Sequence, residues 1–168
     1  YAVAYAFRRS VMFGKFEWAR DLGNPILPPN TGSKYDSTRC MNPFVVCIAD
    51  EYRLYYSGGD EEGCQRICLA TASVDDPTKF KRHGVILNLG GVGAFDAKWC
   101  VLPCVHQFGD RWFMYYSGHE GSDLGLQSFP GIGLAISEDG IHFERYSSEP
   151  VVTGDQTAEF SNNRGVAG

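Results

Sequence analysis

Two related stretches decide the fold, DSTRCMNPFVVC at residues 36–47 and DAKWCVLPCVH at residues 96–106. Three landmarks recur at a spacing of 60 residues: Asp36 with Asp96, Cys40 with Cys100, and Pro43 with Pro103. The motif Tyr-Tyr-Ser-Gly follows at the same spacing, at residues 55–58 and 115–118. Because self-similarity at a fixed period is the signature of a repeat architecture, the chain contains a duplicated unit.

Each unit contains four segments rich in Tyr, Phe, Val and Ile, which are typical of β-strands. The expected strands are residues 44–49, 52–57, 66–72 and 80–87 in the first unit, and 104–108, 112–117, 132–137 and 143–146 in the second. Turn residues such as Asp-Asp-Pro and Glu-Asp-Gly separate these segments. No segment has a convincing helical pattern, so the sequence predicts an all-β protein.

A repeated four-stranded unit is typical of a β-propeller blade. A single blade cannot cover its own faces, so blades must stack around an axis. We therefore expect a single propeller domain, present in part: residues 1–27 end one blade, 28–87 and 88–152 form two complete blades, and 153–168 begin the next. The alternative is an open all-β sandwich built from the duplicated unit.

Composition narrows the function classes. The 168 residues carry a net charge of −5, and the basic residues are scattered, which argues against a nucleic-acid partner. No apolar run approaches the ~18–20 residues needed to span a bilayer, so no membrane span is expected. The sequence shows no cofactor motif, and we expect none.

The six cysteines are compatible with free thiols in a reducing intracellular compartment, although the compartment itself stays open. Cys64 and Cys68 are four residues apart, and Cys100 and Cys104 repeat that interval. A zinc site more often uses a Cys-x-x-Cys pair. We therefore predict no metal site.

Several motifs together resemble a known superfamily: Asn24-Pro-Ile-Leu27, the two proline-containing stretches, the two Tyr-Tyr-Ser-Gly motifs, and the turn at residues 137–143. The chain resembles the five-bladed propellers of the arabinanase, levansucrase and invertase superfamily of glycoside hydrolases. The resemblance implies sugar hydrolysis or transfer in a pocket on the propeller axis. Two or three carboxylates from different blades would carry the acid–base chemistry.

The chain departs from that superfamily at one position. An Asp commonly precedes the proline there, whereas this sequence has Asn42 and Leu102, which cannot act as acid or base. The catalytic candidates are therefore Asp36 and Asp96, which occupy matching places in the two units, and Glu159 from the next unit. The alternative is that both aspartates cap turns.

Five further residues near these stretches suit a sugar or an anionic ligand: Arg39, Lys98, Trp99, His106 and Arg164. Indole can stack on a sugar ring, and guanidinium can bind an anion in a bidentate manner. Packing between blades and surface ion pairs are the alternative roles. The predicted function is thus a glycoside hydrolase-like propeller that acts on or binds an oligosaccharide. The alternative is a non-catalytic propeller that binds carbohydrate or a protein partner.

Overall fold

The computed structural model describes residues 6–8, 18–121 and 131–153. The first unit contains β3 (Arg39–Ile48), β4 (Glu51–Gly59), β5 (Gln65–Ser73) and β6 (Lys81–Leu87). The second contains β7 (Trp99–Phe108), β8 (Arg111–His119), β9 (Gly131–Ser137) and β10 (Glu144–Arg145). Three short strands complete the described part, β1 (Ala6–Arg8), β2 (Trp18–Arg20) and β11 (Val152–Thr153).

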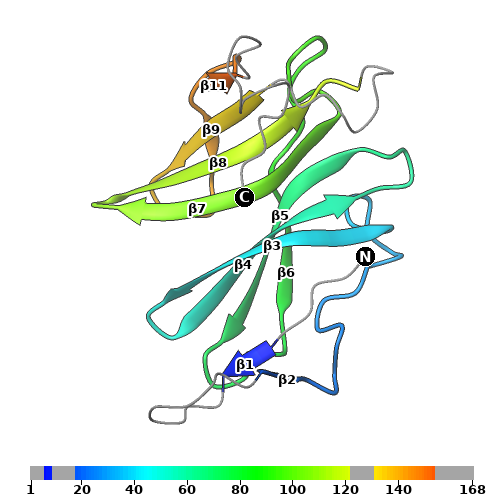
Figure 1. Cartoon of the computed structure of the whole chain (residues 1–168), viewed down its shortest axis with the longest axis vertical. Coiled ribbons are helices and arrows are strands. Elements are labelled where there is room, and N and C mark those ends of the chain that lie inside the picture. Colours follow the sequence, from blue (N-terminus) through cyan, green and yellow to red (C-terminus); the bar gives the residue numbers. More distant parts are fainter. Residues whose placement is uncertain (1–5, 9–17, 122–130, 154–168) are drawn as a thin grey trace.

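Within each unit, consecutive strands pair antiparallel, as expected of a propeller blade (Figure 1). A single parallel pairing, Gln65 with Trp99, joins β5 to β7. The outer edges of the units also correspond, because Leu87 lies opposite Ile67 and Val152 lies opposite Ile132. The expectation of an all-β, partial propeller is confirmed, whereas the number of blades in the whole ring and the exact blade boundaries stay predictions.

The main hydrophobic core lies between the two units. It combines Tyr55, Ile67, Leu69 and Leu87 of the first unit with Cys100, Val105, Trp112, Met114 and Tyr116 of the second. A smaller core, which contains Leu27, Cys40, Leu54, Tyr56, Cys68 and Ala70, lies on the other face of the first unit. Alternate residues of each strand thus serve opposite faces of a blade.

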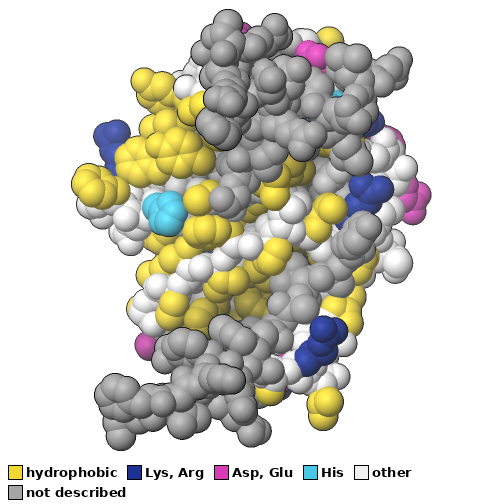
Figure 2. Space-filling view, viewed as in Figure 1, with side chains coloured by type: hydrophobic (Ala, Val, Ile, Leu, Met, Phe, Trp, Pro, Cys, Tyr) yellow, Lys and Arg dark blue, Asp and Glu magenta, His cyan; other side chains and the backbone are white. Residues whose placement is uncertain are grey.

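Hydrophobic side chains also gather on the molecular surface, over the middle of the face seen in Figure 2. On the second unit, Phe108 is 82% exposed and Tyr115 is 40% exposed. Tyr115 matches Tyr55, which is fully buried where the second unit covers the first. The side of the second unit that carries Tyr115 therefore has the residue pattern of an inter-blade face.

The first strand of each unit begins earlier than predicted. β3 starts at Arg39 and β7 at Trp99, so the prolines lie inside the strands and do not open them. The pairing register shifts between Met41 and Phe44 in β3, and at the matching place in β7. A β-bulge tolerates proline because a residue there needs no N–H in the ladder.

Candidate functional site

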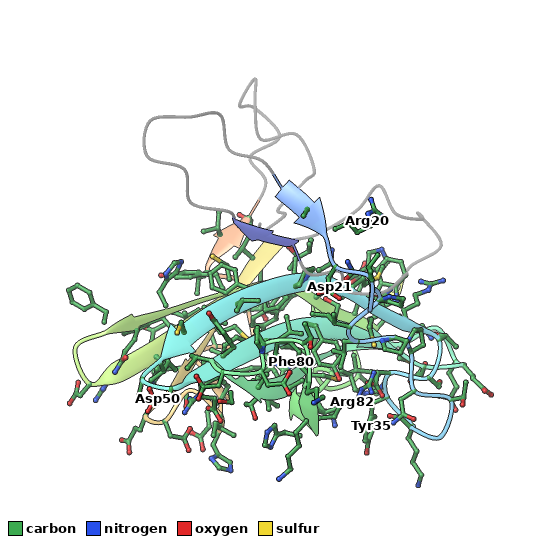
Figure 3. All side chains as sticks on the ribbon, turned by 90° about the horizontal axis from the view of Figure 1, so that it is seen from below. Arg20, Asp21, Tyr35, Asp50, Phe80 and Arg82 are labelled. Carbon is green, nitrogen blue, oxygen red and sulfur yellow. The ribbon has the colours of Figure 1, made fainter. Side chains whose placement is uncertain are left out.

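The Asp36 carboxylate lies in a buried cluster inside the first unit, with 3% of the residue exposed. Its Oδ2 accepts hydrogen bonds from the Tyr56 hydroxyl at 2.8 Å and from Arg82 Nε at 2.9 Å. Arg82 also donates to the carbonyl of Pro28, so it holds both ends of the loop that leads into β3. Arg82 and Tyr35, the residue that precedes Asp36, are labelled in Figure 3.

The second unit repeats this cluster around Asp96, which is 1% exposed. Its Oδ2 accepts hydrogen bonds from the Tyr116 hydroxyl at 3.0 Å and from Arg145 Nε and Nη2 at 2.9 and 2.7 Å. Arg145 also donates to the carbonyl of Asn88. The other carboxylate oxygen, Oδ1, is buried and accepts no hydrogen bond from the described residues.

The electrostatics of the two clusters suit permanent ion pairing. Burial and the adjacent carboxylate raise the pKa of Tyr56 and of Tyr116, so both phenols stay protonated and donate. Burial would lower the pKa of each arginine, but hydrogen bonding and the aspartate charge raise it for Arg82 and Arg145. Each aspartate therefore connects the loop before the first strand to the outer strand.

Two glycines allow the aspartates to lie so close to the sheet. A Cβ atom added at Gly58 would lie 2.9 Å from Asp36 Cβ, and one at Gly118 would lie 2.9 Å from Asp96 Cβ. Such approaches do not occur between real side chains, which explains the glycine of both Tyr-Tyr-Ser-Gly motifs. This motif is thus part of the structure that holds each aspartate.

These surroundings favour a structural role for Asp36 and Asp96. A general acid or nucleophile must reach a substrate, whereas both carboxylates are buried and occupied by arginine and tyrosine. Their catalytic role stays a prediction that the geometry does not favour. Glu159 and Arg164 lie outside the described residues, so their roles also stay predictions.

Sequence reasoning missed the arginines. Arg82 and Arg145 close the two clusters, yet neither was a candidate. A signal was present, because KFKR at residues 79–82 matches HFER at residues 142–145 and only the Phe and the Arg are shared. A shared arginine and a shared aspartate in every unit suggest a repeated ion pair.

The β-bulges bring a different pair of residues to the first strands. Asn42 and Leu102, which directly precede the prolines, have φ values of 53° and 57°. These are left-handed conformations, which asparagine adopts more readily than other non-glycine residues and leucine adopts rarely. β3 and β7 lie next to each other, and the Phe44 and His106 rings pack edge to face with centroids 5.5 Å apart. The bulges therefore lie at matching positions on neighbouring first strands.

Three predicted binding residues lie at the beginning of β3 and β7. Arg39 is exposed at the beginning of β3. Trp99 donates from Nε1 to the carbonyl of Gly63 at 2.7 Å, and its ring packs on His119 with centroids 4.6 Å apart. Lys98 Nζ donates to the carbonyl of Glu62 at 2.9 Å. Lys98 and Trp99 thus hold the β4–β5 loop of the first unit.

The fourth described binding candidate, His106, is exposed on β7. Its Nε2 lies 3.5 Å from Cys104 Sγ, and its ring contacts Phe44 as described above. It therefore lies on the surface of a first strand, as expected, but away from Lys98 and Trp99 at the beginning of that strand. The structure does not bring these four described binding candidates into one cluster; the fifth candidate, Arg164, lies outside the described residues.

The β4–β5 loop carries three potential metal ligands, Asp60, Glu62 and Cys64, whose ligand atoms lie within 4.8 Å of one another. Asp60 is already engaged, because Oδ2 pairs with Arg66 Nη1 at 2.6 Å and Oδ1 accepts the Cys64 N–H at 2.8 Å. Burial would raise the pKa of Asp60, but these hydrogen bonds lower it below its usual value. The arrangement is that of a loop fixed by an ion pair.

All six cysteines have free thiols. Burial raises the pKa of the Cys68 thiol to about 12 and raises that of Cys100 as well, so these thiols stay protonated and unreactive. In the described part of the chain, no helix has the length and apolar character that crossing a membrane requires.

The sequence has two relatives among curated proteins. It is 34% identical over 116 residues to the uncharacterized proteins MT1551 and Rv1502 of Mycobacterium tuberculosis. The match covers 67% of this chain but 38% of each relative, so the chain spans less than half of their length. No protein-family profile matches the sequence.

Solved structures share the fold over nearly the whole chain. A glycosyl hydrolase from Bacteroides ovatus superposes with a TM-score of 0.67 at 17% identity, over 92% of this chain and 46% of that one. A structure described with the GH130 mannoside phosphorylases and the hydrolases of β-1,2-mannosidic linkages in Candida mannan gives a TM-score of 0.66 at 16% identity, over 98% and 46%. The chain therefore has the fold of the glycoside hydrolase propellers and spans slightly less than half of the length of these two structures.

Proposed function

We propose that the chain is part of a glycoside hydrolase-like propeller that binds an oligosaccharide in a pocket on its axis. In this proposal the pocket wall includes the bulges of β3 and β7, where Asn42 and Leu102 face the ligand. The single observation that carries the proposal is the pair of left-handed, non-glycine residues at matching positions of two neighbouring first strands. Sparsely populated backbone conformations cluster at functional sites.

The side chains at the bulges suit sugar binding better than sugar cleavage. The Asn42 amide can donate and accept hydrogen bonds with sugar hydroxyls, and Leu102 offers an apolar surface to the C–H face of a sugar ring. Neither can transfer a proton. Cleavage would therefore need carboxylates from elsewhere in the whole protein, of which Glu159 is one candidate.

A non-catalytic carbohydrate-binding propeller is the second candidate function. The observation that favours it is the engagement of Asp36 and Asp96 in buried ion pairs, since this leaves the described first strands without an available acid–base pair. The two candidates share the pocket and differ only in turnover. They also differ from a protein-interaction scaffold, which would not require sugar binding.

The test combines binding with turnover. The whole protein is screened by isothermal titration calorimetry against mannan-, arabinan- and fructan-derived oligosaccharides, and the best ligand is then assayed for reducing-end release. We expect Asn42→Ala and Leu102→Ala to weaken binding by about tenfold each, in line with the loss of one hydrogen bond or one apolar contact. The exposed Val92, in the loop before β7, supplies the matched control Val92→Ala. Unchanged binding in both bulge variants contradicts the proposal.

A further inference from the structure

The backbone N–H groups of the bulge in β7 can all be accounted for. The pairing register shifts between Val101 and Cys104, so Leu102 and Pro103 together face one residue of β8. Pro103 has no N–H to satisfy. The Leu102 N–H donates to the hydroxyl oxygen of Ser57 at 3.1 Å. Thus the bulge leaves neither of its two residues with an unsatisfied donor.

Ser57 belongs to the other unit. It lies on β4, is fully buried, and is separated from Leu102 by 45 residues of sequence. Within its own unit Ser57 lies opposite Met41, at the edge of the bulge in β3. The hydroxyl therefore connects the bulge region of one blade to the bulge residue of the next.

The bond acts on a strained residue. Leu102 has a φ of 57°, and a leucine in the left-handed region persists only when its surroundings fix it. Pro103 adds to this strain, because a residue that precedes proline favours an extended conformation with negative φ. The Leu102 N–H is held from outside the strand by its hydrogen bond to Ser57.

We propose that Ser57 is a positioning residue that holds Leu102 in its left-handed conformation and thereby sets the direction of the Leu102 side chain. That this side chain faces a sugar rests on the proposed function. The positioning itself does not, because it follows from a buried hydroxyl, a backbone N–H and a positive φ. Ser57 would thus couple the shape of the pocket in one blade to the packing of its neighbour.

The experiment measures amide hydrogen exchange of the full chain by NMR in the wild type and in S57A. Loss of the hydroxyl leaves the Leu102 N–H without its acceptor, so its exchange should accelerate by about 10- to 100-fold relative to the other amides of β7. S137A is the matched control, because it removes another buried serine hydroxyl that fixes a turn at Gly140. The control should leave Leu102 exchange unchanged. Should S57A not fold, the isosteric S57C, whose sulfur is a weaker acceptor, replaces it under the same criterion.

Two results overturn the proposal: a Leu102 amide that keeps its protection, or an equal loss of protection along the whole of β7, which would indicate general loosening. Oligosaccharide binding separates this proposal from the proposed function. Selective loss of protection at Leu102 with a roughly tenfold weaker affinity supports both. The same loss of protection in a protein that binds no oligosaccharide supports the positioning role and contradicts the pocket.

Discussion

In the first unit Asp36 is held by Tyr56 and Arg82, and in the second unit matching residues hold Asp96 in the same way. Both first strands contain a left-handed bulge before a proline, but the bulge residue is Asn42 in one unit and Leu102 in the other. The buried cluster of Asp, Tyr and Arg is thus the same in both units, whereas the residue at the bulge differs. The shared aspartate clusters are therefore part of what each blade needs to fold, whereas the side chain at the bulge differs between the two blades.

Substitutions of the buried aspartates should lower the free energy of unfolding more than any other change considered below. Asp36→Ala and Asp96→Ala each remove a buried carboxylate and leave a half-buried arginine without its partner. Breaking a fully buried pair costs about 3–5 kcal/mol, and we expect a loss at the lower end of that range or below it because each arginine is in part exposed to solvent. We expect the two variants to lose similar free energy of unfolding, measured by urea denaturation. The double variant Asp96→Leu/Arg145→Met should recover much of the loss, because it removes both charges. A folded Asp96→Ala protein of wild-type stability would show that the Asp96 cluster does not stabilise the fold.

The two units differ in the loop before the first strand, where the second unit has Gly90 and the first unit has Asn30 at the matching position. A Cβ at Gly90 would lie 2.0 Å from Asp96 Oδ1, so Gly90→Ala should lower the free energy of unfolding by about 1–3 kcal/mol through overpacking. The adjacent Gly91→Ala is the control, since nothing lies within 4 Å of its added Cβ. Equal effects of the two variants in urea denaturation would contradict this account of the Asp96 pocket.

A tyrosine pair breaks the equivalence of the units. The Tyr55 hydroxyl donates across the interface to the carbonyl of Gly140 at 2.8 Å, whereas the matching Tyr115 is 40% exposed. Tyr55→Phe should therefore cost about 1 kcal/mol, the net value of one hydrogen bond. Tyr115→Phe should leave the urea midpoint unchanged. A larger effect at Tyr115 would mean that this face is already covered in the isolated chain.

The smallest expected effect is a change in how the stability of the protein depends on pH. The first unit has the Asp60–Arg66 pair, whereas β9 of the second unit has Gly131 in the place of Arg66. Because folding lowers the pKa of Asp60, the pair stabilises the protein above the unfolded pKa of about 4, and this stability is lost as the pH falls through the lower folded value. The urea midpoint should therefore drop less between pH 6 and pH 3 in Asp60→Asn than in the wild type. Arg66→Met should flatten the same profile, and a wild-type profile in either variant would contradict the assignment.

The fold was predictable from the sequence because a repeat of about 60 residues with four strand-like segments indicates a propeller blade. Aligning the units located all eight of their strands and the correspondence between them. The predicted beginnings of the two first strands, residues 44 and 104, are wrong, because β3 begins at Arg39 and β7 at Trp99. A proline inside a strand is accommodated either on an edge strand or at a bulge, and the sequence alone does not show which of these applies.

The site was less predictable for a physical reason. The spacing places Asp36 and Asp96 at equivalent points of the repeat, but it does not say whether a side chain points toward the axis or into the blade. That direction depends on contacts with Arg82 and Arg145, which are 46 and 49 residues away in sequence. The bulge residues Asn42 and Leu102 were noted only for lacking a carboxylate, because sequence does not reveal a positive φ.

We infer that the aspartates stabilise the blades, and we propose that the bulges face the ligand. A crystal structure of the whole protein, soaked with the best-binding oligosaccharide from the calorimetric screen, tests both most directly. The account predicts sugar atoms in van der Waals contact with Leu102 and hydrogen-bonded to Asn42, with both arginine–aspartate pairs intact. A sugar bound to Asp36 or Asp96, with its arginine displaced, would contradict the account and restore the aspartates as catalytic residues.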